Sequence, residues 1–276
     1  MFTARTRMET SIGSLKAGIL YCKMHLDKQC KIILKDCMNL KSNESCLIIT
    51  DSKLKNIGFE FFKNSIKITR KAKLITIPIP ESHGSEPPKD VAKEMLNYNV
   101  ILLATTKSLS HTRARKNASK RGVRIASMPG ITIDMIQRTL NTDFNKIKSI
   151  NKNIIKKLFN KNKIKIATKL GTNIEFNLKG RKWISDGGIY TKKGAFGNLP
   201  AGEVFIAPVE GKTSGTIIAD ASVGGLGKVD KNIKLVVKNG FIESISDGKI
   251  ANQFKKLLKS KLYKNVAELG IGTNYK

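Results

Sequence analysis

Short apolar runs and longer amphipathic stretches alternate along the first half of the chain. The runs have the length of β-strands, whereas the stretches carry apolar residues three and four positions apart, which is the spacing of one helix face. The predicted strands cover residues 46–50, 73–77, 99–104 and 123–126. The predicted helices cover residues 15–38, 55–64, 110–120 and 132–140, and one more begins at Pro87 and Pro88. Strands and helices in this order imply a parallel sheet covered by helices.

In the second half the pattern becomes one of strands. A lysine-rich helix at 143–161 comes first, and its apolar stripe of Ile147, Ile150, Ile154 and Leu158 predicts that it docks and bridges two domains. The strands predicted after it cover residues 163–167, 174–178, 203–208, 215–219, 234–238 and 241–245, followed by a helix at 251–264. The last two strands flank an Asn-Gly pair, which is the strongest short-range signal of a β-hairpin.

These patterns predict an α/β chain in two parts. An N-terminal parallel-sheet α/β domain is expected at residues 1–142, and a β-rich α+β domain at 143–276. A length of 276 residues suffices for two hydrophobic cores. Apolar runs stay far below the roughly 20 residues of a membrane span, and the first twenty residues lack the apolar core of a secretory signal. We therefore expect a cytoplasmic protein with no membrane partner.

The net charge of +30 suggests nucleic acid at first sight. However, only nine of the 51 basic residues are Arg, the side chain suited to bidentate phosphate recognition. Aromatic residues make up only 6 % of the chain and do not interleave with the basic ones. The lysines are spread along the chain, so we expect solvated faces and do not favour a nucleic-acid partner.

Four cysteines, Cys22, Cys30, Cys37 and Cys46, match no zinc-binding spacing and predict buried, reduced thiols. Two glutamates are more informative candidates. Glu203 and Glu268 each lie in an otherwise apolar, glycine-framed segment, at 198–208 and 266–274. A buried carboxylate needs a neutralising partner, which can be a divalent metal. The alternative is a strand glutamate that faces solvent or pairs with a lysine.

The segments NLPAGEVFIAP at 198–208 and VAELGIGTN at 266–274 resemble two signatures of the aminopeptidase T family of metallopeptidases. Three segments of the first half, at 82–88, 105–112 and 125–130, resemble archaeal-type members of the same family. The resemblance implies a metalloaminopeptidase that acts on peptides as a homodimer, with a pair of divalent metals (zinc, cobalt, manganese or magnesium). It also implies that residues 143–276 are the metal-binding domain of catalytic type and that Glu203 and Glu268 are metal ligands.

The same resemblance places the general base and the remaining His, Tyr and Asp ligands beyond Lys276. We therefore expect a second domain that is incomplete at its C-terminus, with weak or no peptidase activity. Two other function classes remain as alternatives. One is a non-catalytic binding protein on the peptidase fold, and the other, less favoured, is a basic nucleic-acid-associated protein.

Four smaller features complete the predictions. The segment 106–111 follows a buried strand, so it either lines a ligand crevice or is a loop with Ser110 as helix N-cap. His83 contacts substrate or lies on the surface, and His25 packs on the first helix or faces solvent. The glycine-rich segment 224–227 predicts a turn, because no Lys-Ser/Thr pair follows it.

Overall fold

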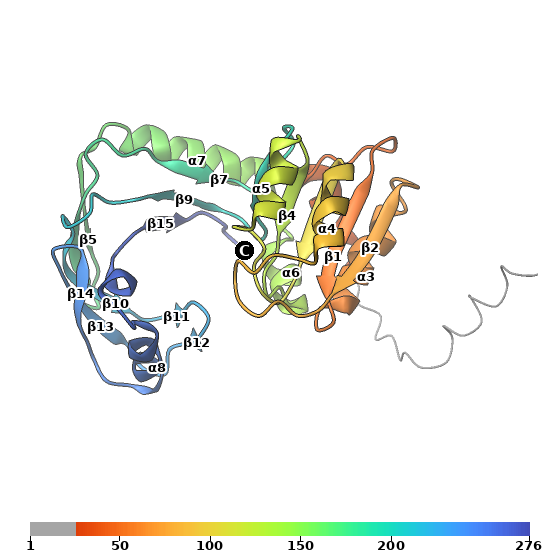
Figure 1. Ribbon diagram of the computed structural model, residues 1–276. Helices are drawn as coiled ribbons and strands as arrows, with labels where there is room; N and C mark the ends of the chain where they lie inside the picture. The colour runs from red at the N-terminus through yellow and green to blue at the C-terminus, as the bar shows by residue number, and fades with distance from the viewer. Residues whose placement is uncertain (1–25) are drawn as a thin grey trace, which may run out of the picture.

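The computed structural model describes residues 26–276, which form two lobes joined along one side by a long helix and three strands (Figure 1). The N-terminal lobe is a five-stranded parallel sheet of order β2-β1-β3-β4-β8. Its strands are β1 (Cys46–Asp51), β2 (Ala72–Ile77), β3 (Val100–Ala104), β4 (Arg124–Ser127) and β8 (Phe196–Asn198). Its helices are α2 (Asp27–Lys31), η2 (Ile32–Cys37), α3 (Lys55–Ser65), α4 (Lys89–Glu94), η3 (Met95–Asn97), α5 (Arg113–Lys120) and α6 (Ile133–Thr139).

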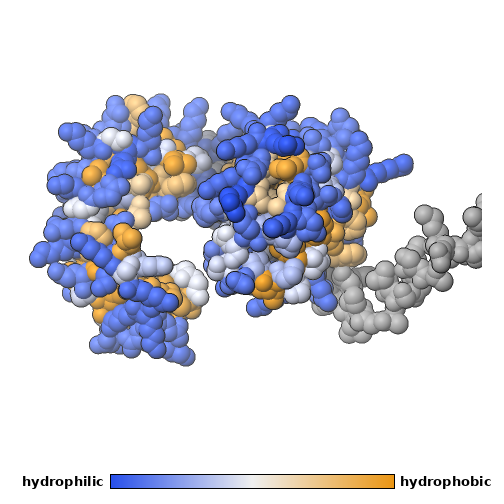
Figure 2. All heavy atoms as spheres, viewed as in Figure 1, coloured by the Kyte–Doolittle hydropathy of each residue, from blue (hydrophilic) through white to orange (hydrophobic). Residues whose placement is uncertain are grey.

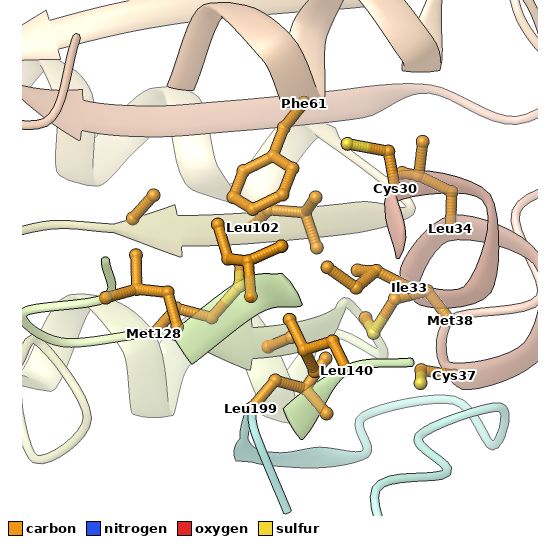
Figure 3. Packing of buried hydrophobic residues seen from close by; sticks show 14 of the residues in the cluster. Cys30, Ile33, Leu34, Cys37, Met38, Phe61, Leu102, Met128, Leu140 and Leu199 are labelled. Atoms are coloured by element: carbon orange, nitrogen blue, oxygen red, sulfur yellow. The ribbon is translucent and has the colours of Figure 1, made fainter. Parts of the chain in front are cut away.

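Both faces of this sheet are buried. Every residue of β1 and β3 is inaccessible to solvent, and alternate side chains belong to two separate apolar clusters. On one face Leu102 packs with Phe61, Met128 and Leu199 (Figure 3). This two-sided burial explains why the strands have continuous apolar sequences. Cys30, Cys37 and Cys46 lie in the same cluster as free, buried thiols, as predicted, whereas Cys22 lies outside the described residues.

The fifth strand of the sheet comes from the second half of the chain. β8 pairs in parallel with β4, and Leu199 beyond it enters the N-terminal core (Figure 3). The sequence Phe-Gly-Asn is too short and too polar to predict a strand. The pairing therefore depends on a tertiary contact that local pattern does not encode. The domain boundary at 142/143 stays a prediction.

The second lobe contains an antiparallel sheet of order β14-β13-β10-β6-β5. Its strands are β5 (Lys163–Ala167), β6 (Asn173–Asn177), β10 (Ser214–Ala219), β13 (Ile233–Lys238) and β14 (Phe241–Ile245). Asn239 and Gly240 both have positive φ, at 48° and 79°, as the predicted hairpin between β13 and β14 requires. Two strands, β11 (Ser222–Val223) and β12 (Gly227–Lys228), form a small hairpin, so the glycine-rich segment is a turn as predicted. The α/β fold class with a β-rich second part is confirmed.

Three helix predictions need correction or remain open. The last helix, α8 (Lys249–Leu257), ends seven residues before the predicted Lys264. A 3-10 turn, η4 (Lys261–Lys264), follows it, because Asn265 and Val266 pair with the edge of β14 at Phe241 and Gly240. The N-cap of α5 is Thr112 and not Ser110, since the Thr112 side chain accepts from the Arg115 N–H. The part of the first predicted helix before residue 26, including His25, lies outside the described residues.

The predicted bridge is α7 (Phe144–Leu158), which lies over a three-stranded antiparallel sheet of order β15-β9-β7 (Figure 1). Its strands are β7 (Ile184–Asp186), β9 (Glu203–Ile206) and β15 (Leu269–Gly272). The expected apolar stripe docks, with Ile147 fully buried and its three partners half-buried. Within residues 26–276, no helix has the length and apolar character to cross a bilayer.

Candidate functional site

The central strand β9 places Glu203 opposite two other residues of interest. In the antiparallel register, Glu203 lies across from Asp186 on β7 and from Gly272 on β15. Directly opposed residues of such a ladder have Cβ atoms about 5 Å apart and point to the same face. The sheet therefore puts two carboxylates side by side, one of which was not predicted from the sequence.

Glu268 shares this face. In β15, Gly272 lies opposite Glu203 and points to the same face of the sheet. Because successive side chains of a strand point to opposite faces, Gly270 and Glu268 share this face, whereas Leu269 points to the other one with its partner Ile206. A Cβ on Gly270 would lie 3.3 Å from Oε2 of Glu203, which shows that the glycine strand leaves room for this carboxylate. The two predicted glutamates are thus brought to one face, together with Asp186.

The opposite face of the sheet is held by one buried amide. Asn151 of α7 is inaccessible to solvent and donates to Ser185 Oγ at 3.0 Å and to the Glu203 carbonyl at 2.8 Å. Its Oδ1 accepts from the Thr273 hydroxyl. A single side chain therefore contacts β7, the backbone of Glu203 in β9 and the residue that follows β15.

A tyrosine links Asp186 to the parallel sheet. The Tyr190 hydroxyl lies 2.7 Å from Asp186 Oδ1 and 2.6 Å from the carbonyl oxygen of Asn198, at the end of β8. The Tyr190 ring packs so closely on Gly197 that a Cβ there would lie 2.3 Å from it, which is why that position is a glycine. Burial and the neighbouring Asp186 raise the pKa of Tyr190, so its hydroxyl stays protonated.

The carboxyl end of the parallel sheet adds a cluster of polar groups. Ser110 is buried, and its Oγ lies 3.0 Å from Ser127 Oγ and 3.3 Å from Asn198 Oδ1. Segment 106–111 therefore lies at the sheet edge where ligands of such folds bind. His83 and His111 are exposed; the Nδ1 of His83 accepts from the Ser108 N–H at 3.1 Å, and whether it contacts substrate stays a prediction.

Asp186, Glu203 and Glu268 make one side of the three-stranded sheet an acidic face. No basic side chain pairs with these three carboxylates in the described residues. Burial, then the proximity of Glu268 and Asp186, raises the pKa of Glu203, and burial raises the pKa of Asp186. None of the ion pairs formed within residues 26–276 includes these three carboxylates. A bound cation would relieve this repulsion.

Carboxylate oxygens suit hard divalent ions. Both described histidines, His83 and His111, lie in connections between elements of the parallel-sheet lobe, the first between β2 and α4 and the second between β3 and α5. In the described part of the chain, no set of three or more His, Cys, Asp or Glu side chains has the geometry to hold a metal.

The three-stranded sheet borders a large hollow. α7 covers the other face of the three-stranded sheet, and this sheet runs along one side of the space between the two lobes (Figure 1). Figure 2 shows that the molecular surface is deeply hollowed there. Ile184, 52 % exposed, and the half-buried Phe205 flank the carboxylates on the same face and give it an apolar part.

Asp186 and Tyr190 were missed from the sequence because Ile-Ser-Asp-Gly-Gly has the composition of a turn, and β7 is only three residues long. The only available signal was an Asp followed four residues later by a Tyr within a polar stretch. That signal is too common to single out a site.

Two solved structures share the fold. The structure of 2,5-dihydroxypyridine dioxygenase from Pseudomonas putida KT2440 matches with a TM-score of 0.74 and 16 % identity, over 90 % of this chain and 76 % of that one. Wild-type AmpT from Thermus thermophilus matches with a TM-score of 0.59 and 15 % identity, over 90 % and 77 %. At such identities the likeness establishes the fold alone. No protein of curated function matches the sequence.

The sequence profile of the 2,5-dihydroxypyridine 5,6-dioxygenase (NicX) family matches residues 15–275. This match overturns the aminopeptidase T resemblance, and with it the expected peptidase, protease and hydrolase activity. It equally gives no support to a non-catalytic binding protein or a nucleic-acid-associated protein. The match supports two more general expectations, namely that the chain belongs to a family of enzymes and that a divalent metal takes part. It does not support the peptidase type or a pair of metals. The chain belongs to the 2,5-dihydroxypyridine 5,6-dioxygenase family.

Proposed function

We propose that this chain is a metal-dependent dioxygenase that opens a hydroxylated pyridine ring. The observation that carries the proposal is the family match over residues 15–275. The family name denotes insertion of both atoms of dioxygen at the bond between carbons 5 and 6 of 2,5-dihydroxypyridine. A planar, polar heteroaromatic substrate suits a hollow with both carboxylates and the apolar side chains Ile184 and Phe205.

We further propose that Glu203 and Glu268 are oxygen ligands of a divalent cation. Their shared face, the room left by Gly270 and the raised pKa of Glu203 support this role. Among the described residues, no set of three or more His, Cys, Asp or Glu side chains has the geometry to hold a metal, so these two glutamates would be only part of a ligand set. Whether one ion or a pair binds is measured by metal analysis of dialysed protein.

The experiment is oxygen uptake by the purified chain with 2,5-dihydroxypyridine, after anaerobic loading with ferrous iron. Mass spectrometry with labelled dioxygen should find two labelled atoms in the product. The analogue 2-hydroxypyridine, which lacks one hydroxyl, serves as the control substrate. Glu203→Gln and Glu268→Gln should lower divalent metal affinity in equilibrium dialysis, whereas Glu243→Gln on β14 should not. Absence of both substrate-dependent uptake and saturable substrate binding would overturn the dioxygenase proposal.

Two expectations about the whole protein stay proposals. A homodimer is tested by light scattering after gel filtration, and a cytoplasmic location by fractionation of cells. Neither is needed for the assignment of the two glutamates.

A further inference from the structure

A cavity of about 510 Å³ lies where α7 ends and the chain enters β5, at the end of α7 distant from the parallel sheet (Figure 1). Its walls come from the last turn of α7, the following loop, and the turn between β6 and β7. It is therefore separate from the acidic face, which lies on the side of the three-stranded sheet away from α7. A volume of this size is in the range of small-molecule sites.

Aromatic and aliphatic side chains form one part of the cavity, and Trp183 and Phe159 are the largest of them. Phe159 is 68 % exposed, so this ring is not used by the fold itself. The indole Nε1 of Trp183 is buried and has no hydrogen-bond acceptor among the described residues. No hydrogen bond within the described residues therefore fixes this indole, and its contribution to the cavity wall is an aromatic surface.

The remaining part of the cavity is basic. Lys161, Arg181 and Lys182 line it, and no acidic residue does. Arg181 already pairs with Glu210, but Lys161 and Lys182 form no ion pair within residues 26–276. Two exposed ammonium groups beside an aromatic wall favour a ligand that is apolar at one end and anionic at the other.

We propose that this cavity binds an aromatic carboxylate, with the ring against Trp183 and Phe159 and the carboxylate at Lys161 and Lys182. The site is distinct from the metal-binding face, and the proposal does not depend on the dioxygenase activity. Its chemistry, a flat apolar ring plus one negative charge, follows from the lining of the cavity.

Trp183 is the only tryptophan of the chain, so it reports directly on occupancy. The probe is 4-bromobenzoate, whose bromine quenches indole fluorescence on contact, and the neutral control is 4-bromobenzyl alcohol. Saturable quenching by the carboxylate is expected, with affinity for the alcohol about tenfold weaker because the charge-assisted contact is lost. Free N-acetyltryptophanamide measures the quenching that arises from collisions alone.

Variants locate the site. Lys182→Gln and Phe159→Ser change exposed residues and should each weaken binding of 4-bromobenzoate about tenfold, the loss expected for one charge-assisted or aromatic contact. Lys179→Gln removes a neighbouring exposed lysine that does not line the cavity, and should leave binding unchanged. Quenching that is linear, equal for the acid and the alcohol, or insensitive to Lys182→Gln would overturn the proposal. So would a Trp183 signal that changes with protein concentration alone, since a second copy would then fill the cavity.

Discussion

The parallel sheet of the N-terminal lobe is buried on both faces, whereas the three-stranded sheet β15-β9-β7 is covered on one face only. The first is held by two apolar clusters, which include Leu102 and Leu103 of the same strand. The second is covered by α7, whose apolar stripe and Asn151 dock on it, and its other face carries unneutralised carboxylates. The difference indicates a division of roles. The parallel sheet is a scaffold, and the one-sided sheet leaves a face free for ligands.

Truncation of buried side chains should have the largest effect on the free energy of unfolding, and the effect should differ between the two lobes. Leu102 is fully buried within a large cluster, whereas Leu235 on β13 is 9 % exposed in a small one. Leu102→Ala should therefore lower the free energy of unfolding toward the upper end of about 2–5 kcal/mol, and Leu235→Ala toward the lower end. Urea unfolding followed by circular dichroism measures both, while Trp183 fluorescence follows the second lobe. An equal or greater loss in Leu235→Ala would show that the core of the N-terminal lobe does not stabilise the chain more than the small cluster around β13.

Asn151 tests how the one-sided sheet is held. Asn151→Leu keeps the volume but leaves the Glu203 carbonyl and the Thr273 hydroxyl without their partner, which should cost about 1–3 kcal/mol. Because Glu203 belongs to the same strand, its affinity for a divalent cation should fall as well. Asn153→Leu, on the exposed side of the same helix, is the matched control and should change neither quantity. Denaturant titration and equilibrium dialysis provide the two measurements.

The same contrast explains what the sequence could predict. The continuous apolar runs of β1 and β3 predicted a parallel sheet, because burial on both faces leaves a strong local pattern. Glu203 and Glu268 were found because a carboxylate in an apolar segment is unusual. Asp186 and Tyr190 were missed because their roles arise from contacts with Glu203 and Asn198, which no local pattern encodes.

The family assignment failed for a related reason. Segments 198–208 and 266–274 contain β9 and β15, the strands that build the one-sided sheet. Two solved structures whose names denote different proteins share this fold over 90 % of the chain. Likeness in short framework segments therefore predicted the fold correctly and the reaction wrongly, whereas the profile over residues 15–275 distinguished the families.

A smaller effect on stability is expected at Tyr190, which links β7 to the parallel sheet. Tyr190→Phe removes the hydroxyl that lies between Asp186 and the Asn198 carbonyl, and should cost about 0.5–1.5 kcal/mol. Amide hydrogen exchange should increase in β7 and β8 more than in β3, since only the first two meet at this hydroxyl. Tyr263→Phe, at an exposed tyrosine of η4, is the control. Unchanged exchange in β7 would mean that Asn151 alone fixes this strand.

The smallest effect is expected from the charge of the acidic face. The pKa of Glu203 is raised above its ordinary value of 4.5, chiefly by burial and then by Glu268 and Asp186. As the pH rises above 4.5, the carboxyl group of Glu203 therefore ionises in the unfolded chain before it ionises in the folded one. Ionisation favours the unfolded chain, so the free energy of unfolding falls until the pH passes the raised pKa of the folded state. Glu203→Gln removes this loss, so at neutral pH it should melt slightly above the wild type, and the difference should vanish below pH 4.5. Because Glu203 is partly exposed, solvent screening keeps the shift small.

A divalent cation should act in the same direction as that substitution. Added manganese or magnesium should raise the melting temperature of the wild type at neutral pH, because the ion neutralises the carboxylates in the folded state only. The variant Glu203→Gln has lost a proposed ligand and should respond less, whereas Glu243→Gln on β14 should respond as the wild type does. Thermal melts with and without the ion, across acidic to neutral pH, measure both effects together. Equal stabilisation of all three proteins would show that the free face of the one-sided sheet is not where the cation binds.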